Sequence, residues 1–345
     1  MKGGKYGTTL TGGKYNVGTA FKLTSPAKGK TAWTLSKLYD FKDTATYDPD
    51  HSDAHPYDAA LTAAGDLIVE TEGTPKVYGG PANSALVMLA PSKAGQPWTE
   101  TIIQKFADTP LNSFTLTSSG TIIGAEPYVL NKSNGSIWQW TLVKGKWTSA
   151  ELYGYPGYTT SYGQNPLVAV ELDKNGALYG TTSDGGTGTN GTVFKLTPSA
   201  NKTAPWALTV LYSFPISGAQ GQYPKPYLTM DTSGSLEGST IQGSSGDTGA
   251  IFKLTPSVNG KTWTESVIYN GPQLETGVVI FGASGENPLG IISGDSTSPG
   301  IFFMLTKPAA VAKGVARPAV SGRPITYAPG YKFVDSLSLS AGPSS

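Results

Sequence analysis

The stretch 176-GALYGTTSDGGTGTNGTVFKLTPS-199, continued by 206-WALTVLYSF-214, decides the fold of this chain. It contains short runs rich in Val, Leu, Tyr and Thr, and clusters of Gly, Asn, Asp and Ser separate them, which is the pattern of β-strands joined by turns. A further apolar run, 166-PLVAVELD-173, precedes it. We therefore predict a repeat of four strands: A at 166–173, B at 177–182, C at 191–197 and D at 206–214.

Three motifs recur along the chain and count the repeats. Copies of the strand C segment begin 51 to 66 residues apart, at 18–26, 84–91, 135–142, 191–199, 249–257 and 300–308. A glycine stands in the turn before each strand B, at Gly3, Gly65, Gly120, Gly176, Gly234 and Gly285. A tryptophan opens strand D in all repeats but the last, at Trp33, Trp98, Trp147, Trp206 and Trp263. Six repeats of four strands indicate a β-propeller with six blades.

The chain begins at a strand B, so the predicted ring needs a strand from the other end. The segment 336-SLSLSAG-342 is similar to 113-SFTLTSSG-120, a strand A with its turn, and we predict that residues 333–341 complete the first blade. A disordered tail, or donation of this strand to a neighbouring subunit, is the alternative. The outer strand of the last blade then falls within 309–330, with 323–329 as the candidate. This gives one all-β domain, 1–345, with blades at 1–45 plus 333–342, 46–107, 108–155, 156–215, 216–271 and 272–330.

The order LYGTT, double glycine, GTVFKLTP, Trp and LYSF resembles the GloVer tandem repeat of bacterial surface and secreted proteins. It is also similar to kelch propellers, whose double glycine corresponds to Gly12-Gly13 and Gly185-Gly186. The resemblance covers nearly the whole chain. It implies a fold and no activity, because no catalytic motif defines the GloVer family.

Composition excludes several classes of protein. The 25 basic and 24 acidic residues nearly cancel and charged residues make up 14% of the chain, so we expect no binding of nucleic acid or of an anionic membrane. The absence of Cys excludes disulfides and cysteine-ligated zinc. The N-terminus has no apolar signal segment and no apolar run could span a membrane. Low charge with many Thr, Ser, Gly and Tyr residues favours an extracellular or cell-surface location.

Two loops between repeats are candidate binding sites, because loops on a rigid scaffold carry function. The first, 47-YDPDHSDAHPYD-58, holds both histidines, and Asp50, His51, Asp53 and His55 could bind a divalent metal such as calcium. A solvated polar insertion is the alternative.

The second loop, 153-YGYPGYTTSYGQ-164, is rich in tyrosine. Tyr155, Tyr158 and Tyr162, with Tyr47 of the first loop, could stack on a sugar ring or contact a protein. The alternative is that one or two of these rings pack beneath the loop.

Carboxylates on the inner strands make an enzymatic function an alternative. Glu70, Glu72, Glu126 and Glu237 lie in or just after strands B, and a pair of them across the channel mouth could act on a glycoside. No catalytic motif accompanies them. We therefore predict a non-catalytic extracellular propeller that binds polysaccharide or protein through its loops, or serves a structural role. A subunit that self-associates by strand exchange, and a carbohydrate lyase or hydrolase, are the alternatives.

Overall fold

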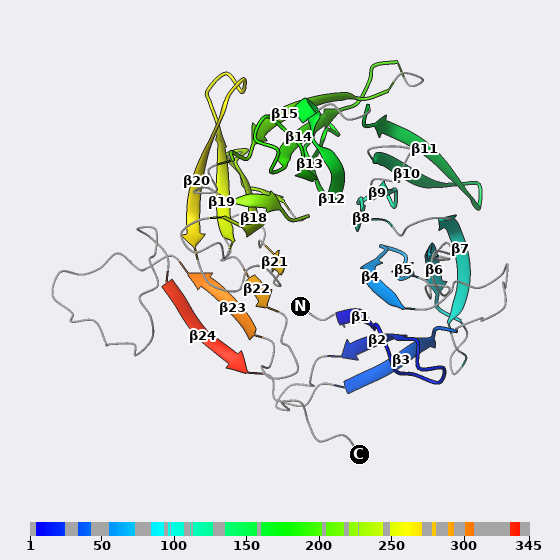
Figure 1. Cartoon of the computed structure of the whole chain (residues 1–345). Helices are drawn as coiled ribbons and strands as arrows, with labels where there is room; N and C mark the ends of the chain where they lie inside the picture. The colour runs from blue at the N-terminus through cyan, green and yellow to red at the C-terminus, as the bar shows by residue number, and fades with distance from the viewer. Residues whose placement is uncertain are drawn as a thin grey trace, which may run out of the picture. The chain divides into compact units, whose positions relative to one another are not determined.

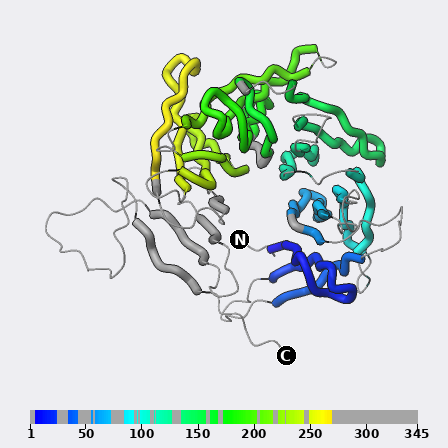
Figure 2. The backbone as a smooth tube through the Cα atoms, viewed as in Figure 1, coloured from blue at the N-terminus to red at the C-terminus, as the bar shows by residue number. Residues whose placement is uncertain are grey.

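The computed structural model describes most of the chain between residues 5 and 338, in two compact units, Met1–Gly154 and Tyr155–Ser345. Figure 2 colours most of the described backbone and leaves the rest grey. The described residues are 5–24, 34–42, 55–72, 84–92, 96, 98–106, 111, 113–126, 135–156, 160–201, 205–216, 221–226, 228–243, 249–270, 278–280, 289–292, 301–306 and 332–338. Each unit is described by itself below.

Unit 1 contains three antiparallel sheets of consecutive strands, drawn from blue to green in Figure 1. The first sheet is β1 (Lys5–Thr9), β2 (Thr19–Thr24) and β3 (Thr34–Asp40). The second is β4 (Pro56–Leu61), β5 (Leu67–Thr71), β6 (Ser84–Ala90) and β7 (Thr99–Phe106). The third is β8 (Ser113–Leu116), β9 (Ile122–Glu126), β10 (Ser136–Val143) and β11 (Lys146–Gly154).

Unit 2 repeats this arrangement. After the short 3-10 helix η1 (Thr160–Tyr162), the fourth sheet is β12 (Gln164–Leu172), β13 (Leu178–Asp184), β14 (Thr192–Thr197) and β15 (Ala207–Ser213). The fifth is β16 (Gln222–Pro224), β17 (Thr229–Met230), β18 (Leu236–Gln242), β19 (Ala250–Pro256) and β20 (Trp263–Asn270). The sixth is β21 (Val278–Ile280), β22 (Leu289–Ile292), β23 (Ile301–Thr306) and β24 (Lys332–Ser338). The chain is thus an all-β, propeller-like repeat protein.

The predicted turn glycines explain how strands A and B are joined. Gly65, Gly120, Gly176 and Gly234 all have positive φ, between 77° and 95°, a conformation that glycine adopts without steric cost. Each donates its backbone N–H to the carbonyl three residues earlier, at 2.9–3.0 Å. These four turns confirm the glycine motif, and Gly3 and Gly285 lie outside the described residues.

Strands C and D meet through the same irregularity in all six sheets. The register shifts once in each pair, for example between Val193 and Phe194 in β14 and between Ile251 and Phe252 in β19. Side chains from neighbouring sheets of one unit then form the cores. In unit 2, Phe214 and Phe252 are fully buried edge to face, with ring centroids 5.2 Å apart. The repeat therefore buries both faces of a sheet by packing it against the next.

The prediction for the C-terminal strand is wrong. Residues 332–338 form β24, which pairs antiparallel with β23 as the outer strand of the sixth sheet (Figure 1). The pair carries the register shift typical of strands C and D, between Phe302 and Met304, which identifies β24 as a strand D. The first sheet accordingly has three strands among the described residues. The segment 323–329, predicted to be that outer strand, lies outside them.

Candidate functional site

The loops between strands B and C are fastened by backbone hydrogen bonds at the end of the sheet where strand A begins. In unit 2, the carbonyl of Gly191 accepts from Phe214 N at 3.0 Å, and that of Asn190 accepts from Tyr223 N of the next sheet at 2.9 Å. In unit 1, the carbonyls of Gly18 and Val17 accept from Phe41 N (3.1 Å) and His55 N (2.9 Å). These loops are therefore rigid parts of the scaffold that join neighbouring sheets.

His55 holds a structural position of this junction. Its φ is 66°, and Asn165 and Tyr223, which also stand directly before a proline at the start of a strand A, have φ of 58° and 54°. This left-handed conformation is unfavourable for such residues and persists because the surrounding hydrogen bonds hold it. The His55 ring also hydrogen-bonds through Nδ1 to the carbonyl of Leu10, at 3.0 Å.

The predicted metal site therefore remains a prediction. Asp50, His51 and Asp53 lie outside the described residues, and His55 is the member of the set that the structure places. Among the residues described, no group of three or more His, Asp or Glu side chains could hold a metal ion.

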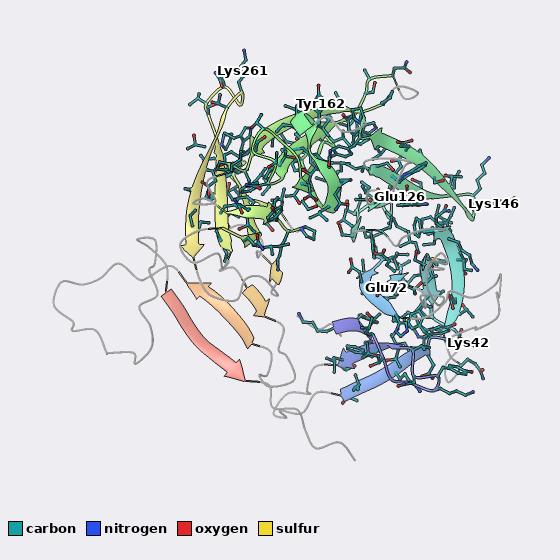
Figure 3. All side chains as sticks on the ribbon, in the orientation of Figure 1. Lys42, Glu72, Glu126, Lys146, Tyr162 and Lys261 are labelled. Carbon is teal, nitrogen blue, oxygen red and sulfur yellow. The ribbon has the colours of Figure 1, made fainter. Side chains whose placement is uncertain are left out.

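Of the predicted ligand-binding tyrosines that the structure describes, one is buried and one is exposed. Tyr155 is 4% exposed and packs edge to face on Phe194, with ring centroids 6.2 Å apart, so this ring supports its loop from beneath. Tyr162, in η1, is 43% exposed and is labelled in Figure 3. Tyr47 and Tyr158 lie outside the described residues. Tyr162 is thus the predicted ligand-binding tyrosine that the structure places on the surface.

Exposed aromatic rings share one location within their sheets. In the described part of the chain, two aromatic side chains are strongly exposed, Tyr15 at 41% and Tyr162. Tyr15 lies in the loop between β1 and β2, and Tyr162 lies in the connection that enters β12. In an antiparallel meander both kinds of connection emerge at the same end of the sheet. Each unit therefore presents a tyrosine at its strand B–strand C end.

The candidate carboxylates belong to three different sheets. Glu126, in β9, accepts hydrogen bonds from Ser136 Oγ (3.2 Å) and Trp138 Nε1 (3.1 Å) within its own sheet. Burial raises the pKa of Glu126, and these two donors oppose the rise. Glu72 is exposed just after β5, on a different sheet (Figure 3). Glu237 of unit 2 pairs with Lys253 at 3.1 Å.

A pair of carboxyl groups that was not predicted lies in the second sheet. Asp58 of β4 and Glu70 of β5 are cross-strand partners, next to a register shift between Pro56 and Asp58. Glu70 is 0% exposed, and no described side chain donates a hydrogen bond to its carboxylate oxygens. Burial raises the pKa of Glu70 well above its usual range, and the neighbouring Asp58 adds to the rise. Burial also raises the pKa of Asp58, to about 6.

Glu70 was a candidate from the sequence, whereas Asp58 was expected in the loop between the first two repeats. The pair could have been found from one departure in the repeat, a glutamate where other strands B carry a small residue. The fourth residue of β9, β13 and β18 is small (Ala125, Thr181 and Ser239), whereas β5 carries Glu70 there.

The match to a family model settles the family. Residues 103–308, well over half of the chain, match the model of the Gloeobacter/Verrucomicrobia repeat. The chain belongs to this repeat family. The match confirms the resemblance drawn from the GTVFKLTP, double-glycine and Trp motifs.

The comparison with curated proteins found no match to this Gloeobacter/Verrucomicrobia repeat protein. Among solved structures, it is similar to a sialidase from Trypanosoma rangeli in complex with sialic acid, at 10% identity and a TM-score of 0.45, covering 87% of this chain and 51% of that one. The chain is also similar to a hypothetical selenium-binding protein from Sulfolobus tokodaii, at 13% identity and a TM-score of 0.43, covering 72% of this chain and 64% of that one. A GH43_1 enzyme from Xanthomonas citri has 13% identity, a TM-score of 0.39 and coverage of 78% and 88%.

The chain thus spans about half of the sialidase and less than two thirds of the selenium-binding protein. Because their TM-scores are below 0.5, these likenesses carry no argument about activity. In the part of the chain that the structure describes, no helix is long and apolar enough to cross a membrane.

Proposed function

We propose that this protein is a non-catalytic extracellular binding protein that engages a polysaccharide through the strand B–strand C end of its sheets. One observation carries the proposal. The two strongly exposed aromatic rings of the described residues, Tyr15 and Tyr162, both lie at that end of their sheets. A tyrosine ring can stack on the apolar face of a sugar while its hydroxyl forms a hydrogen bond.

The environment of Tyr15 and Tyr162 supports this use. The ammonium group of Lys14 lies 5.1 Å from the centroid of the Tyr15 ring, which limits the freedom of that ring. Tyr162 is followed by Gly163, whose φ is 88° and where an added Cβ would meet the side chain of Thr182. Loops held in this way lose little conformational entropy when a ligand binds.

The candidate acidic groups favour binding over catalysis. Glu126 and Glu237 make hydrogen bonds or ion pairs inside their own sheets, and Glu70 is fully buried. A glycosidase requires two carboxyl groups that both reach the substrate. The described residues offer no such exposed pair from the set Glu70, Glu72 and Glu126.

The six sheets also fit the blades of one six-bladed propeller, which is part of the proposal. Strand β24 serves its own sixth sheet. Self-association through exchange of that strand therefore has no support in the described residues.

A polysaccharide array probed with the whole protein tests the proposal. We expect binding to one or more glycans, and a loss of affinity of roughly two- to tenfold in Tyr162→Ala, since a ring contact of this kind is worth about 0.5–1.5 kcal/mol. Val258→Ser, which removes an exposed side chain at the opposite end of a sheet in the same unit, is the matched control. Binding that Tyr162→Ala and Tyr15→Ala leave unchanged would refute the site, and binding to protein ligands alone would refute the polysaccharide.

A further inference from the structure

In the third, fourth and fifth sheets the position of Glu70 holds a small buried residue: Ala125, Thr181 and Ser239. In the fourth sheet the corresponding Thr181 is fully buried, and its hydroxyl donates to the carbonyl of Lys225, at the start of the fifth sheet, at 3.0 Å. In the fifth sheet the position holds Ser239, which is 2% exposed. In the second sheet it holds a carboxyl group, which is far more costly to bury than a hydroxyl.

The surroundings of Glu70 show how the cost is reduced. Its cross-strand partner Asp58 lies directly opposite, which places the two Cβ atoms about 4.5–5.5 Å apart, so the two carboxyl groups can meet. Next to them stands the beginning of the third sheet, where the backbone amides of Leu111 and Phe114 oppose the rise in pKa of Glu70 and Asp58, respectively. Asp58 Oδ1 also accepts from the N–H of Ala59 at 2.8 Å.

Few other charged groups face the pair. On β5, Glu72 lies two residues beyond Glu70, is exposed, and adds a weaker repulsion. On β6, the residue opposite Glu70 is the buried Leu86. The third sheet contributes Leu111 and Phe114, which carry no charge. A fully buried acid, Glu70, and a partly buried acid, Asp58, thus lie opposite each other without a described cationic side chain between them.

The Asp58–Glu70 pair is better suited to bind a proton than a metal ion. A cation of the calcium type requires six to eight oxygen ligands, and the described residues contain no cluster of three carboxylate or imidazole groups. The third sheet offers N–H donors, which favour carboxyl oxygens and repel a cation. Two carboxyl groups on directly opposite residues can instead share one proton, since ionising both in a site that buries Glu70 is unfavourable.

We propose that Asp58 and Glu70 form a proton-binding site that fastens the second sheet to the third. At neutral pH the pair retains one proton, with one carboxyl group donating to the other. When that proton passes to solvent at higher pH, two negative charges remain in the buried site, and the contacts with Leu111 and Phe114 weaken.

The sign of the pH dependence follows from the raised pKa values. Because both groups bind a proton more tightly in the folded chain than in the unfolded chain, their stabilisation is complete below pH about 4. It is lost as the pH rises through about 6, where Asp58 titrates, and further as Glu70 titrates. The site therefore makes unit 1 less stable in alkaline solution than in weakly acidic solution.

Urea unfolding of the full chain between pH 5 and pH 9 tests the proposal, with Glu70→Gln as the variant and Glu72→Gln as the matched control. Between pH 5 and pH 8 we expect the unfolding equilibrium constant of the wild type to rise roughly tenfold more than that of Glu70→Gln, since one unit of pKa shift corresponds to tenfold. Glu72→Gln, which removes only the weaker repulsion on Glu70, is expected to reduce the pH dependence far less than Glu70→Gln does. Equal pH dependence in the wild type and Glu70→Gln would overturn the proposal.

Two further measurements keep the test decisive if Glu70→Gln folds poorly. Glu70→Thr, which introduces the residue of the fourth sheet, is expected to flatten the pH dependence as well. Hydrogen exchange of the wild-type Leu111 and Phe114 amides, corrected for the intrinsic pH effect, is expected to accelerate between pH 6 and pH 9. Unchanged protection would count against the proposal. If added CaCl2 stabilised the wild type but not Glu70→Thr, the pair would bind a cation and not a proton. That result would also overturn the proposal.

Discussion

The second and fourth sheets have the same strand order and differ at one buried position. In the fourth sheet, Thr181 donates a hydrogen bond to the carbonyl of Lys225, and its cross-strand partner is the apolar Leu167. In the second sheet, Glu70 takes that position, opposite Asp58 and beside the amide of Leu111. A hydroxyl group satisfied by one carbonyl has thus been replaced by an acid pair, at the same contact between consecutive sheets.

A single buried position that departs from the repeat can give one sheet a property that the other sheets lack. The turns and junctions keep their geometry from sheet to sheet because the scaffold depends on them. A buried position that departs from the repeat must be compensated locally, and Asp58 provides the compensation for Glu70. Such departures are where sites that respond to solution conditions are to be sought.

The largest effect is expected from placing the acid where the compensation is missing. Thr181→Glu buries a carboxyl group opposite Leu167, with no acid to share its proton. We expect a loss of roughly 3 kcal/mol or more in the free energy of unfolding at pH 8, since a buried charge without a partner is among the most destabilising changes. Urea unfolding monitored by tryptophan fluorescence measures it.

The loss from Thr181→Glu should shrink at pH 5, where the new carboxyl group can be protonated. Thr181→Ser keeps the hydroxyl donor and serves as the control for the side chain's shape. A variant Thr181→Glu as stable as the wild type at pH 8 would show that this position tolerates an acid without a partner, and would remove the contrast between the two sheets.

An intermediate effect is expected at the glycines that join sheets in both units. Gly18 and Gly191 have φ of 110° and 96°, and an added Cβ would meet the prolines that begin the next sheets, Pro56 and Pro224, at 2.5 Å. Gly18→Ala and Gly191→Ala should each cost roughly 2–3 kcal/mol, because strain in φ and a steric clash add. Thermal or urea unfolding of the two variants measures the cost.

Gly176→Ala is the control for this pair. Its φ is 77°, but the nearest atom to an added Cβ is Cγ of Pro198 at 3.9 Å, so we expect only about 1 kcal/mol from the left-handed backbone. Losses for Gly18→Ala and Gly191→Ala no larger than this would show that the junctions are looser than their backbone hydrogen bonds indicate.

The smallest effect is expected from the lysines of strand C that pair with an aspartate in the turn between strands A and B. Lys253 Nζ lies 2.6 Å from Asp231 Oδ2, and Lys195 Nζ lies 3.4 Å from Asp173 Oδ2. Burial alone would raise the pKa of Asp231, but hydrogen bonds from Lys253 and Ser233 outweigh it and lower the pKa to about 2. Lys253→Met should cost about 0.5–1 kcal/mol, since exposed ion pairs contribute little.

Lys195→Met is the matched variant of the fourth sheet and should cost less than Lys253→Met, because its ion pair is longer and lacks a second acid. The order of the two losses, measured by urea unfolding at pH 7, is the critical result. A larger loss for Lys195→Met would contradict the interpretation that the second acid, Glu237, strengthens the tie in the fifth sheet.

The repeat itself could be predicted from the sequence because its marks are local. Turn glycines at Gly65 and Gly176 and the recurring GTVFKLTP segment report backbone conformation directly. The C-terminal strand was misassigned because 332–338 carries the alternation of any strand, and its choice of partner depends on β23. Local pattern predicts strands more reliably than it predicts which edge they join.

The candidate site could be predicted only in part. Tyr162 was found because a tyrosine in a loop of small residues is visible in the sequence, whereas burial of Tyr155 depends on Phe194 of another strand. The acid pair escaped because Asp58 belongs to a strand whose register with β5 shifts at Pro56. Cross-strand proximity of this kind depends on tertiary pairing and leaves no mark in linear spacing.

Glu70 is expected to keep its proton at a pH where a solvent-exposed glutamate has lost it. Carbon-13 NMR of the Glu70 and Asp58 carboxyl groups, followed from pH 4 to pH 9 in the full chain, tests this most directly, with the exposed Glu72 as an internal reference. We expect the Asp58 signal to change near pH 6 and the Glu70 signal to change well above the usual range of a glutamate. A Glu70 signal that changes within the usual range of a glutamate would contradict this expectation.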